Sequence, residues 1–178
     1  MSDPAYLTAG FTVAGDTIHA ELSVTLDNHL EEVWAALTEP QWLVKWLAPG
    51  EIELRAGGVA RLKFLESGGA IESRVTAIAP QRLLEYSWSS PGEPLRPLRW
   101  ELEPIGPTTL LTLRLGIPSR EDAGRAAAGW AAHLEMLQIA LVGAAAKFPF
   151  EVFKAARDAY REQVAKLLAE RRPVQVSS

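Results

Sequence analysis

Hydrophobic and polar residues alternate without a break between positions 17 and 26, which predicts a β-strand with one buried face. From Asn28 the spacing becomes helical, and Asn28 and Glu31 stand at the spacing of a capping box. The apolar stripe of this helix consists of Leu30, Val33, Trp34 and Leu37. Pro40 suits the first turn of a second short helix, which we expect to end near Leu47.

A period of two returns after this helical pair and continues almost to position 118. Six further strands are expected, at positions 51–56, 59–66, 70–78, 82–88, 98–103 and 109–117. Glycine and proline separate them: Gly57 and Gly58 are turn residues, Ser67-Gly68-Gly69 suits a hairpin, and an irregular loop occupies positions 89–97. Together with the first strand this makes about seven strands.

From about Ser119 the pattern is helical. Ser119 is the expected N-cap of a long helix, with Glu121 and Asp122 in its first turn. The buried stripe of this helix consists of Trp130, Leu134, Leu137 and Leu141. The order of elements predicts an α+β fold. A curved antiparallel sheet of about seven strands grips a long C-terminal helix, with two short helices after the first strand and an extra C-terminal helix.

Four stretches carry a family resemblance: "EEVWAALTEPQWLVKWLAPG", "VTAIAPQRLLEYSW", "WELEPIGPTTLLTLRLGIP" and "GWAAHLEMLQIAL". In this order and spacing they resemble the helix-grip superfamily (Bet v 1-like, START-related, SRPBCC), in the branch related to the activator of Hsp90 ATPase. The resemblance covers positions 18 to 142. It implies a helix-grip domain at residues 1–147, with residues 148–178 as an additional C-terminal helix and tail.

The resemblance also implies a cavity between the sheet and the long helix. Its superfamily includes lipid carriers, hormone receptors and polyketide cyclases. The resemblance therefore implies a ligand-binding fold but not a particular function. The tryptophan-asparagine signature of the cochaperone's separate activating domain is not found in this sequence. Chaperone activation is therefore not the function that the resemblance favours.

Composition restricts the partners and the compartment. The net charge of −4 argues against a nucleic-acid partner and against anionic membrane surfaces. The chain has no cysteine, which excludes disulfides, thiolate metal sites and cysteine nucleophiles. The longest uncharged apolar run, at positions 139–146, is too short to span a bilayer, and the N-terminal sequence lacks the pattern of a signal peptide. We expect a cytoplasmic protein that needs no cofactor.

No motif assigns a catalytic residue or a metal ligand. His19 should face outward on the first strand, and His29 should lie in the first turn of a helix. His133 adjoins the buried stripe of the long helix, where an imidazole has a pKa suited to proton transfer. We expect His133 to be bonded to a backbone carbonyl or to contact a ligand rather than to act as a catalytic base. Cross-strand ion pairs on the solvent side are expected for four charged residues: Glu72, Arg74, Arg99 and Glu101.

The chain has six tryptophans, which is many for a core with only two methionines. Trp34 has the spacing of a plain core residue, whereas Trp46 is expected to line the entrance of a pocket. Aromatic side chains suit a pocket because they combine rigid walls with a polar N–H group. The residues expected to line the cavity are Trp42, Trp46, Phe64, Tyr86, Trp88, Trp100, Trp130, His133 and Leu137.

These observations favour a binding module for a small hydrophobic or amphipathic molecule. Two alternatives stay open: a cyclase- or hydrolase-type enzyme that uses His133 with Arg74 or Tyr86 in the same cavity, and a cochaperone-like interaction domain.

The last helix is expected from about Glu151 to Arg171. Its apolar face consists of Phe153, Ala156, Tyr160, Val164 and Leu167. An isolated helix of this length needs a cover for such a face. It should either fold back over its own domain, as a lid on the cavity, or pack on a second copy. We expect a homodimer, since two-fold association commonly covers a surplus apolar stripe.

Overall fold

The computed structural model describes residues 6–64 and 69–171. Within these residues one antiparallel sheet holds eight strands in the order β1-β2-β8-β7-β6-β5-β4-β3. The strands are β1 (Ala9–Ala14), β2 (Thr17–Leu26), β3 (Gly50–Ile52), β4 (Val59–Lys63), β5 (Ala70–Ala79), β6 (Leu83–Ser87), β7 (Pro97–Ile105) and β8 (Thr108–Pro118). The helices are α1 (Leu30–Thr38), α2 (Pro40–Trp46), α3 (Ala123–Leu141) and α4 (Phe150–Glu170). The predicted α+β fold is confirmed. The turn predicted at Ser67 and Gly68 lies outside the described residues.

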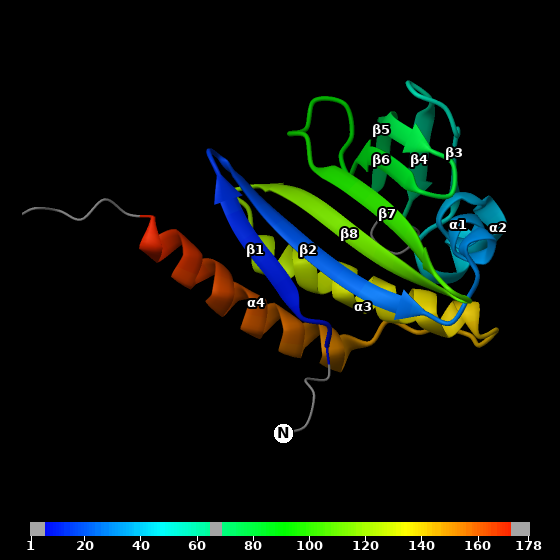
Figure 1. Cartoon of the computed structure of the whole chain (residues 1–178). Helices are drawn as coiled ribbons and strands as arrows, with labels where there is room; N and C mark the ends of the chain where they lie inside the picture. Colours follow the sequence, from blue (N-terminus) through cyan, green and yellow to red (C-terminus); the bar gives the residue numbers. More distant parts are fainter. Residues whose placement is uncertain (1–5, 65–68, 172–178) are drawn as a thin grey trace, which may run out of the picture.

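One face of the sheet is buried against the helices. Figure 1 shows α3 and α4 on the same side of the sheet, with α1 and α2 together at one end. The alternation in the sequence selects this face, because Leu98, Trp100 and Leu102 of β7 are all buried. The strand register pairs Trp100 with Leu113 of β8, which is also buried. The core therefore lies between the inward side chains of the strands and α3.

Strand β1 was not predicted from the sequence. It pairs with β2 along its whole length through a tight hairpin at Gly15, whose φ of +58° suits glycine. Its sequence, AGFTVA, is short and contains a glycine and two alanines, which are depleted in strands and weaken the strand signal. The edge position of β1 is stabilised by α4, because Gln163 donates a hydrogen bond to the Ala9 carbonyl at 3.2 Å.

Two predicted N-caps are wrong, by one and by three residues. Helix α1 has His29 as its N-cap without a side-chain hydrogen bond, so the capping box at Asn28 and Glu31 does not form. The Asn28 amide instead donates to Glu32 at 2.9 Å. Helix α3 begins at Ala123, because Asp122 rather than Ser119 accepts the capping hydrogen bond from the Arg125 amide at 3.1 Å.

Helix α4 folds back on its own chain. It packs against α3 and β1, and three of its residues are buried: Ala156, Tyr160 and Val164. The Tyr160 hydroxyl donates to the Leu7 carbonyl, and its ring contacts Phe11 edge-on at 5.6 Å. Arg161 forms an ion pair with Asp122, which joins α4 to the start of α3. The apolar face of α4, from which we predicted a homodimer, is thus largely covered within the chain. The homodimer itself stays a prediction.

The solvent face of the sheet carries a chain of ion pairs across four strands. Arg114 of β8 contacts Glu101 of β7 at 2.7 Å, and Arg99 contacts Glu101 at 3.1 Å and Glu85 of β6 at 3.2 Å. Glu21 of β2 extends the chain to the other side of Arg114. The predicted solvent-side pairing is confirmed for Arg99 and Glu101.

Glu72 and Arg74 of β5 also lie on the solvent face, as predicted. Glu72 forms a cross-strand ion pair with Arg61 of β4 at 3.0 Å, whereas the exposed Arg74 donates to the Gly57 carbonyl at 3.3 Å. Arg74 lies on the solvent face, so its suggested role inside the cavity is wrong. Among residues 6–64 and 69–171, no helix is long and apolar enough to cross a membrane. The same part of the chain holds no cluster of three His, Asp or Glu residues that could hold a metal ion.

Candidate functional site

Aromatic rings from α2, β7, α3 and the ends of β4 and β6 meet at the interface between the sheet and α3. Trp100 of β7 contacts Trp46 of α2 at 5.9 Å and Trp130 of α3 at 5.8 Å between ring centroids. Trp88, directly after β6, contacts Trp130 at 4.7 Å and Phe64 at 5.4 Å. The three contacts between tryptophans are edge-to-face, the arrangement that aromatic pairs prefer. We call these five residues the aromatic cluster.

Trp46 lies in the interior and not at an entrance. Its side chain is 1% exposed, and its indole N–H donates to the Ala36 carbonyl at 2.8 Å. The predicted entrance position of Trp46 is therefore wrong, because the hydrogen bond to α1 turns the ring into the core. Trp34 is buried, as predicted. Trp42 is half-buried on α2, and the Lys45 ammonium lies 4.4 Å from its ring centroid.

The members of the aromatic cluster differ in exposure. Trp46, Trp100 and Trp130 are buried, whereas Trp88 and Phe64 are half-buried at its edge. Trp88 and Phe64 are thus the members that solvent reaches most easily. Leu137, another residue predicted for the cavity, is fully buried on α3.

His133 bonds to a backbone carbonyl, as the sequence predicted. Its Nδ1 lies 3.0 Å from the carbonyl oxygen of Trp46, which ties α3 to the end of α2. Because the carbonyl can only accept, Nδ1 carries the proton and Nε2 is left as the acceptor. Burial lowers the pKa of His133 below its usual range, and the hydrogen bond to Trp46 offsets this in part. The imidazole is therefore neutral near pH 7.

The burial of His133 predicts a pH dependence of stability. Because its pKa is lower in the folded chain, the unfolded chain takes up the proton first as the pH falls below about 6.5. We expect the free energy of unfolding, measured with urea, to fall between pH 7.5 and pH 5.5. His133→Gln should reduce this fall, since its amide can still donate to the Trp46 carbonyl but does not titrate. An equal fall in both proteins would contradict the prediction.

Tyr86 of β6 carries an unsatisfied polar group into the interior. Its side chain is 1% exposed, and within the described residues its hydroxyl has no hydrogen-bond partner. The Trp100 indole is close enough to lower the pKa of the phenol slightly without forming a hydrogen bond of normal geometry. Burial has the larger effect and raises this pKa well above its usual range. The hydroxyl therefore keeps its proton and is a free hydrogen-bond donor.

The aromatic cluster continues beyond α3 in a way that the sequence did not predict. The segment between α3 and α4 turns back along α3, so that Phe148 contacts His133 at 5.7 Å. Phe148 in turn contacts Phe150 and Phe153 at 4.9 and 5.7 Å. Phe150 is 65% exposed, so a row of aromatic rings leads from Trp130 to the surface. The sequence Phe148-Pro149-Phe150 predicts a turn but not the residue that it contacts.

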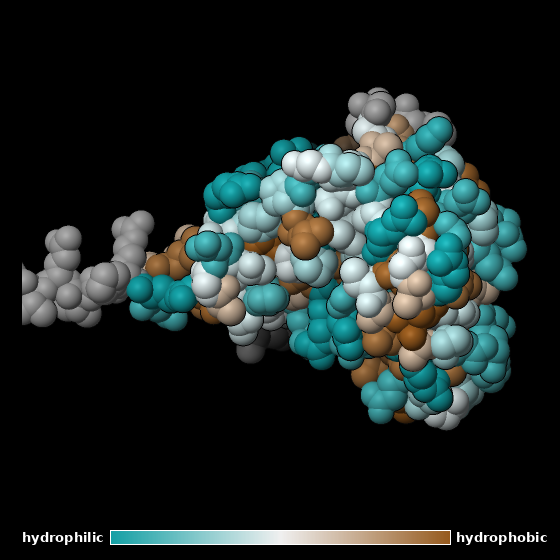
Figure 2. Space-filling view, turned by 90° about the horizontal axis from the view of Figure 1, so that it is seen from above, coloured by the Kyte–Doolittle hydropathy of each residue, from teal (hydrophilic) through white to brown (hydrophobic). Residues whose placement is uncertain are grey.

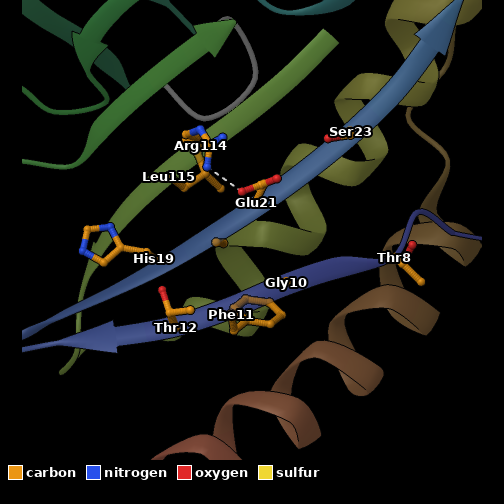
Figure 3. A pocket seen from close by; sticks show the side chains of 10 residues that line it. Thr8, Gly10, Phe11, Thr12, His19, Glu21, Ser23, Arg114 and Leu115 are labelled. Atoms are coloured by element: carbon orange, nitrogen blue, oxygen red, sulfur yellow. Dashed lines mark hydrogen bonds and ion pairs between the residues drawn. The ribbon is translucent and has the colours of Figure 1, made fainter. Parts of the chain in front are cut away.

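Among the described residues, hollows on the surface are lined by none of the nine residues predicted for the cavity. One hollow, of 790 Å³, is on the solvent face of β1, β2 and β8 (Figure 3). Figure 3 shows Glu21 pointing toward Arg114, so the charges in this groove already neutralise each other. The second, 380 Å³, lies under the loop after β6 and is lined by Ser87 and Ser89. The third, 280 Å³, is over β7 and β8 beside Arg99.

The outer surface is mixed in character. Figure 2 shows hydrophobic residues in small patches between hydrophilic ones on the face seen from above. Among the described residues, the most exposed large hydrophobic side chains are Val142 and Leu95, at 78% and 75%. The unsatisfied Tyr86 hydroxyl and the buried members of the aromatic cluster lie inside the molecule. We therefore take the interface of the sheet with α3 as the candidate site.

A curved antiparallel sheet that holds a long helix against one face defines a helix-grip protein. The chain belongs to the Activator of Hsp90 ATPase homolog 1-like protein family, whose model matches residues 27–141, more than half of the chain. This confirms the resemblance found in the sequence. A comparison with curated proteins gives no match.

Solved structures share the fold over most of their length. A conserved protein of unknown function from Enterococcus faecalis, EF2215, is 21% identical with a TM-score of 0.76, over 89% of this chain and 91% of that chain. CalU16 from Micromonospora echinospora is 23% identical with a TM-score of 0.74, over 89% of this chain and 98% of that chain. The product of gene BPP1335 from Bordetella parapertussis is 24% identical with a TM-score of 0.67, over 92% of this chain and 95% of that chain. At these identities the similarity shows the fold alone.

Proposed function

We propose that this protein binds a small hydrophobic or amphipathic molecule between the sheet and α3. The observation that carries the proposal is the buried Tyr86 hydroxyl, which has no partner among the described residues. Leaving such a group unsatisfied costs about 1–3 kcal/mol, and buried polar side chains are nearly always hydrogen-bonded. A ligand with an acceptor group would satisfy Tyr86 and bury its apolar part among the tryptophans.

The ligand would enter beside Trp88 and Phe64. These two rings form the half-buried edge of the aromatic cluster, and behind them lies buried Trp130. Movement of Trp88 away from Trp130 would open a path between the rings without unpacking Trp46 or Trp100. This supports an entrance on the side of β6 rather than at α2, where the sequence predicted it.

The alternative of a cyclase- or hydrolase-type enzyme draws less support from the geometry. Arg74 lies on the solvent face, so Tyr86 and His133 are the polar groups that are left from that hypothesis. His133 uses its Nδ1 to hold the Trp46 carbonyl, and no carboxylate of the described residues is hydrogen-bonded to it. A cochaperone-like interaction domain would need a surface that binds a partner protein. The described residues support such a surface less directly than Tyr86 supports a ligand.

Binding of a neutral fluorescent probe tests the proposal. N-phenyl-1-naphthylamine emits strongly in apolar surroundings, and we expect its fluorescence to rise with saturation when the folded protein is titrated. Trp88→Ala should change the affinity more than it changes the midpoint of thermal unfolding. Leu95→Ala, which alters an exposed side chain on the loop between β6 and β7, is the control and should change neither. Absence of saturable binding to the wild-type protein would overturn the proposed function.

Native mass spectrometry of protein purified from its own host complements this test. A co-purifying small molecule would give the mass of the natural ligand. The same spectrum reports the oligomeric state, and with it the expected homodimer.

A further inference from the structure

The interior holds no charged side chain among the described residues. Its buried hydroxyl groups, apart from that of Tyr86, belong to Thr38, Ser87, Ser89, Thr109 and Tyr160. Each is satisfied within the protein: Thr38 bonds the Trp34 carbonyl, Ser87 and Ser89 bond each other, Thr109 bonds the Asn28 carbonyl, and Tyr160 bonds the Leu7 carbonyl. The imidazole of His133 is neutral near pH 7, because burial lowers its pKa. The ion pairs among the described residues all lie at exposed or half-exposed positions. No cation or anion is therefore available to a ligand that enters beside α3.

This absence of charge selects among ligands. A carboxylate or an ammonium group placed among the tryptophans would be buried without a partner, which costs far more than burying a neutral polar group. Fatty acids and amines therefore fit the site poorly. The polar part of the ligand has to be neutral.

The Tyr86 hydroxyl specifies the kind of neutral group. Its raised pKa keeps the proton on the phenol, so the hydroxyl offers a donor to the ligand. Trp46 cannot compete for the same acceptor, because its N–H is bonded to the Ala36 carbonyl. A carbonyl oxygen is a strong neutral acceptor with two lone pairs. The ligand therefore needs such an oxygen opposite Tyr86.

The ring geometry specifies the apolar part. Trp88 and Trp130 meet at 4.7 Å with an interplanar angle of 76°, and Trp100 and Trp130 meet at 5.8 Å and 79°. A flat ring that displaces the half-buried Trp88 from Trp130 can restore the same edge-to-face contacts, at the separations of about 4.5–7 Å that aromatic pairs prefer. An alkyl chain of equal area would restore the burial but not these contacts, which add to the affinity beyond burial.

We propose that the ligand is a neutral, planar aromatic compound with a carbonyl oxygen that accepts a hydrogen bond from Tyr86. This inference rests on the proposed function and narrows it. The aromatic part lies between Trp88 and Trp130, and the carbonyl group points toward β6.

Three probes that differ in one property each test the inference. 2-Acetylnaphthalene is a neutral aromatic ketone, 2-naphthoate keeps the rings but carries a carboxylate, and 2-decanone keeps the ketone on an alkyl chain. Affinities are measured by displacement of N-phenyl-1-naphthylamine at pH 7.5 and by equilibrium dialysis. We expect 2-acetylnaphthalene to bind at least about tenfold more tightly than either of the other two.

Removal of one hydroxyl tests the role of Tyr86. Tyr86→Phe should weaken the binding of 2-acetylnaphthalene about fivefold to tenfold, the effect of one hydrogen bond. Tyr86→Phe should change the weaker affinity for 2-decanone less than truncation of a ring in the aromatic cluster would. It should not lower the thermal stability of the free protein, because it removes an unsatisfied polar group. Tyr160→Phe is the matched control: its hydroxyl is bonded to the Leu7 carbonyl, and its loss should leave the affinity for the ketone unchanged.

The outcomes separate this inference from the function on which it rests. Equal or tighter binding of 2-naphthoate or 2-decanone would overturn the aromatic carbonyl ligand while a hydrophobic binding protein remains. An unchanged affinity in Tyr86→Phe would overturn the hydrogen bond from Tyr86. If neither N-phenyl-1-naphthylamine nor any of the three probes binds, the proposed function fails as well.

Discussion

Trp46→Ala is expected to lower the free energy of unfolding by about 3–5 kcal/mol, the usual cost of truncating a large buried aromatic side chain. The Trp46 ring is almost fully buried and contacts Trp100 edge-on. The truncation also leaves the Ala36 carbonyl without the indole N–H that it now accepts from. The sequence alone assigned Trp46 to a pocket entrance, where its truncation would affect binding more than folding, and burial reverses this expectation.

Chemical denaturation followed by far-UV circular dichroism measures this effect without depending on tryptophan fluorescence. Trp88→Ala is the matched comparison, because it removes the same side chain from the half-buried edge of the aromatic cluster. Its loss of stability should be clearly smaller. Trp34→Ala, in the core, should resemble Trp46→Ala. Equal losses for Trp46 and Trp88 would show that the cluster is uniformly packed and would weaken the entrance beside β6.

Gly124→Ala is expected to destabilise the protein by about 1–3 kcal/mol through overpacking, although alanine is the better helix former. Gly124 lies in the first turn of α3, where α4 crosses it. A Cβ atom at this position would lie 2.6 Å from the backbone nitrogen of Arg161 and 2.8 Å from its Cα. Because backbone atoms of a packed helix cannot rotate away, α4 would have to move. Such a movement would also loosen the ion pair between Arg161 and Asp122.

The same substitution elsewhere in α3 provides the control. A Cβ atom at Gly129 would meet no atom within 4 Å, so Gly129→Ala should gain helix propensity, about 0.5–1 kcal/mol, at no steric cost. Thermal unfolding of both variants gives the comparison, and hydrogen exchange in α4 shows whether that helix is the part that loosens. A Gly124→Ala variant as stable as Gly129→Ala would contradict the close packing of α3 and α4.

Much of the fold could be predicted from the sequence because the signal is local. The alternation in β2, β7 and β8 selects the buried face wherever the chain is extended. The stripe from Trp130 to Leu137 likewise selects the buried side of α3. Exact helix starts were less predictable, because Ser119 and Asp122 are both good N-cap residues and only the path of the chain decides between them.

The sequence predicted most residues of the candidate site but not how they are arranged or which of them are in contact. Trp88, Trp100 and Trp130 do come together, and His133 does bond a backbone carbonyl. The sequence cannot show which of these aromatic residues contact one another, since each contact joins distant parts of the chain. It could not show that Tyr86 lacks a partner either, because that depends on every neighbouring element at once.

The sequence by itself determined the class of fold, the family and the inward positions of the strands and α3, because periodicity and family motifs are properties of neighbouring residues. Only the tertiary structure decided two features: α4 lies on α3 and β1, and Trp46 turns into the core. Each depends on contacts between segments far apart in the chain, such as Gly124 with Arg161 or Trp46 with His133. Such contacts leave no periodic signal, and they determine where a ligand can enter.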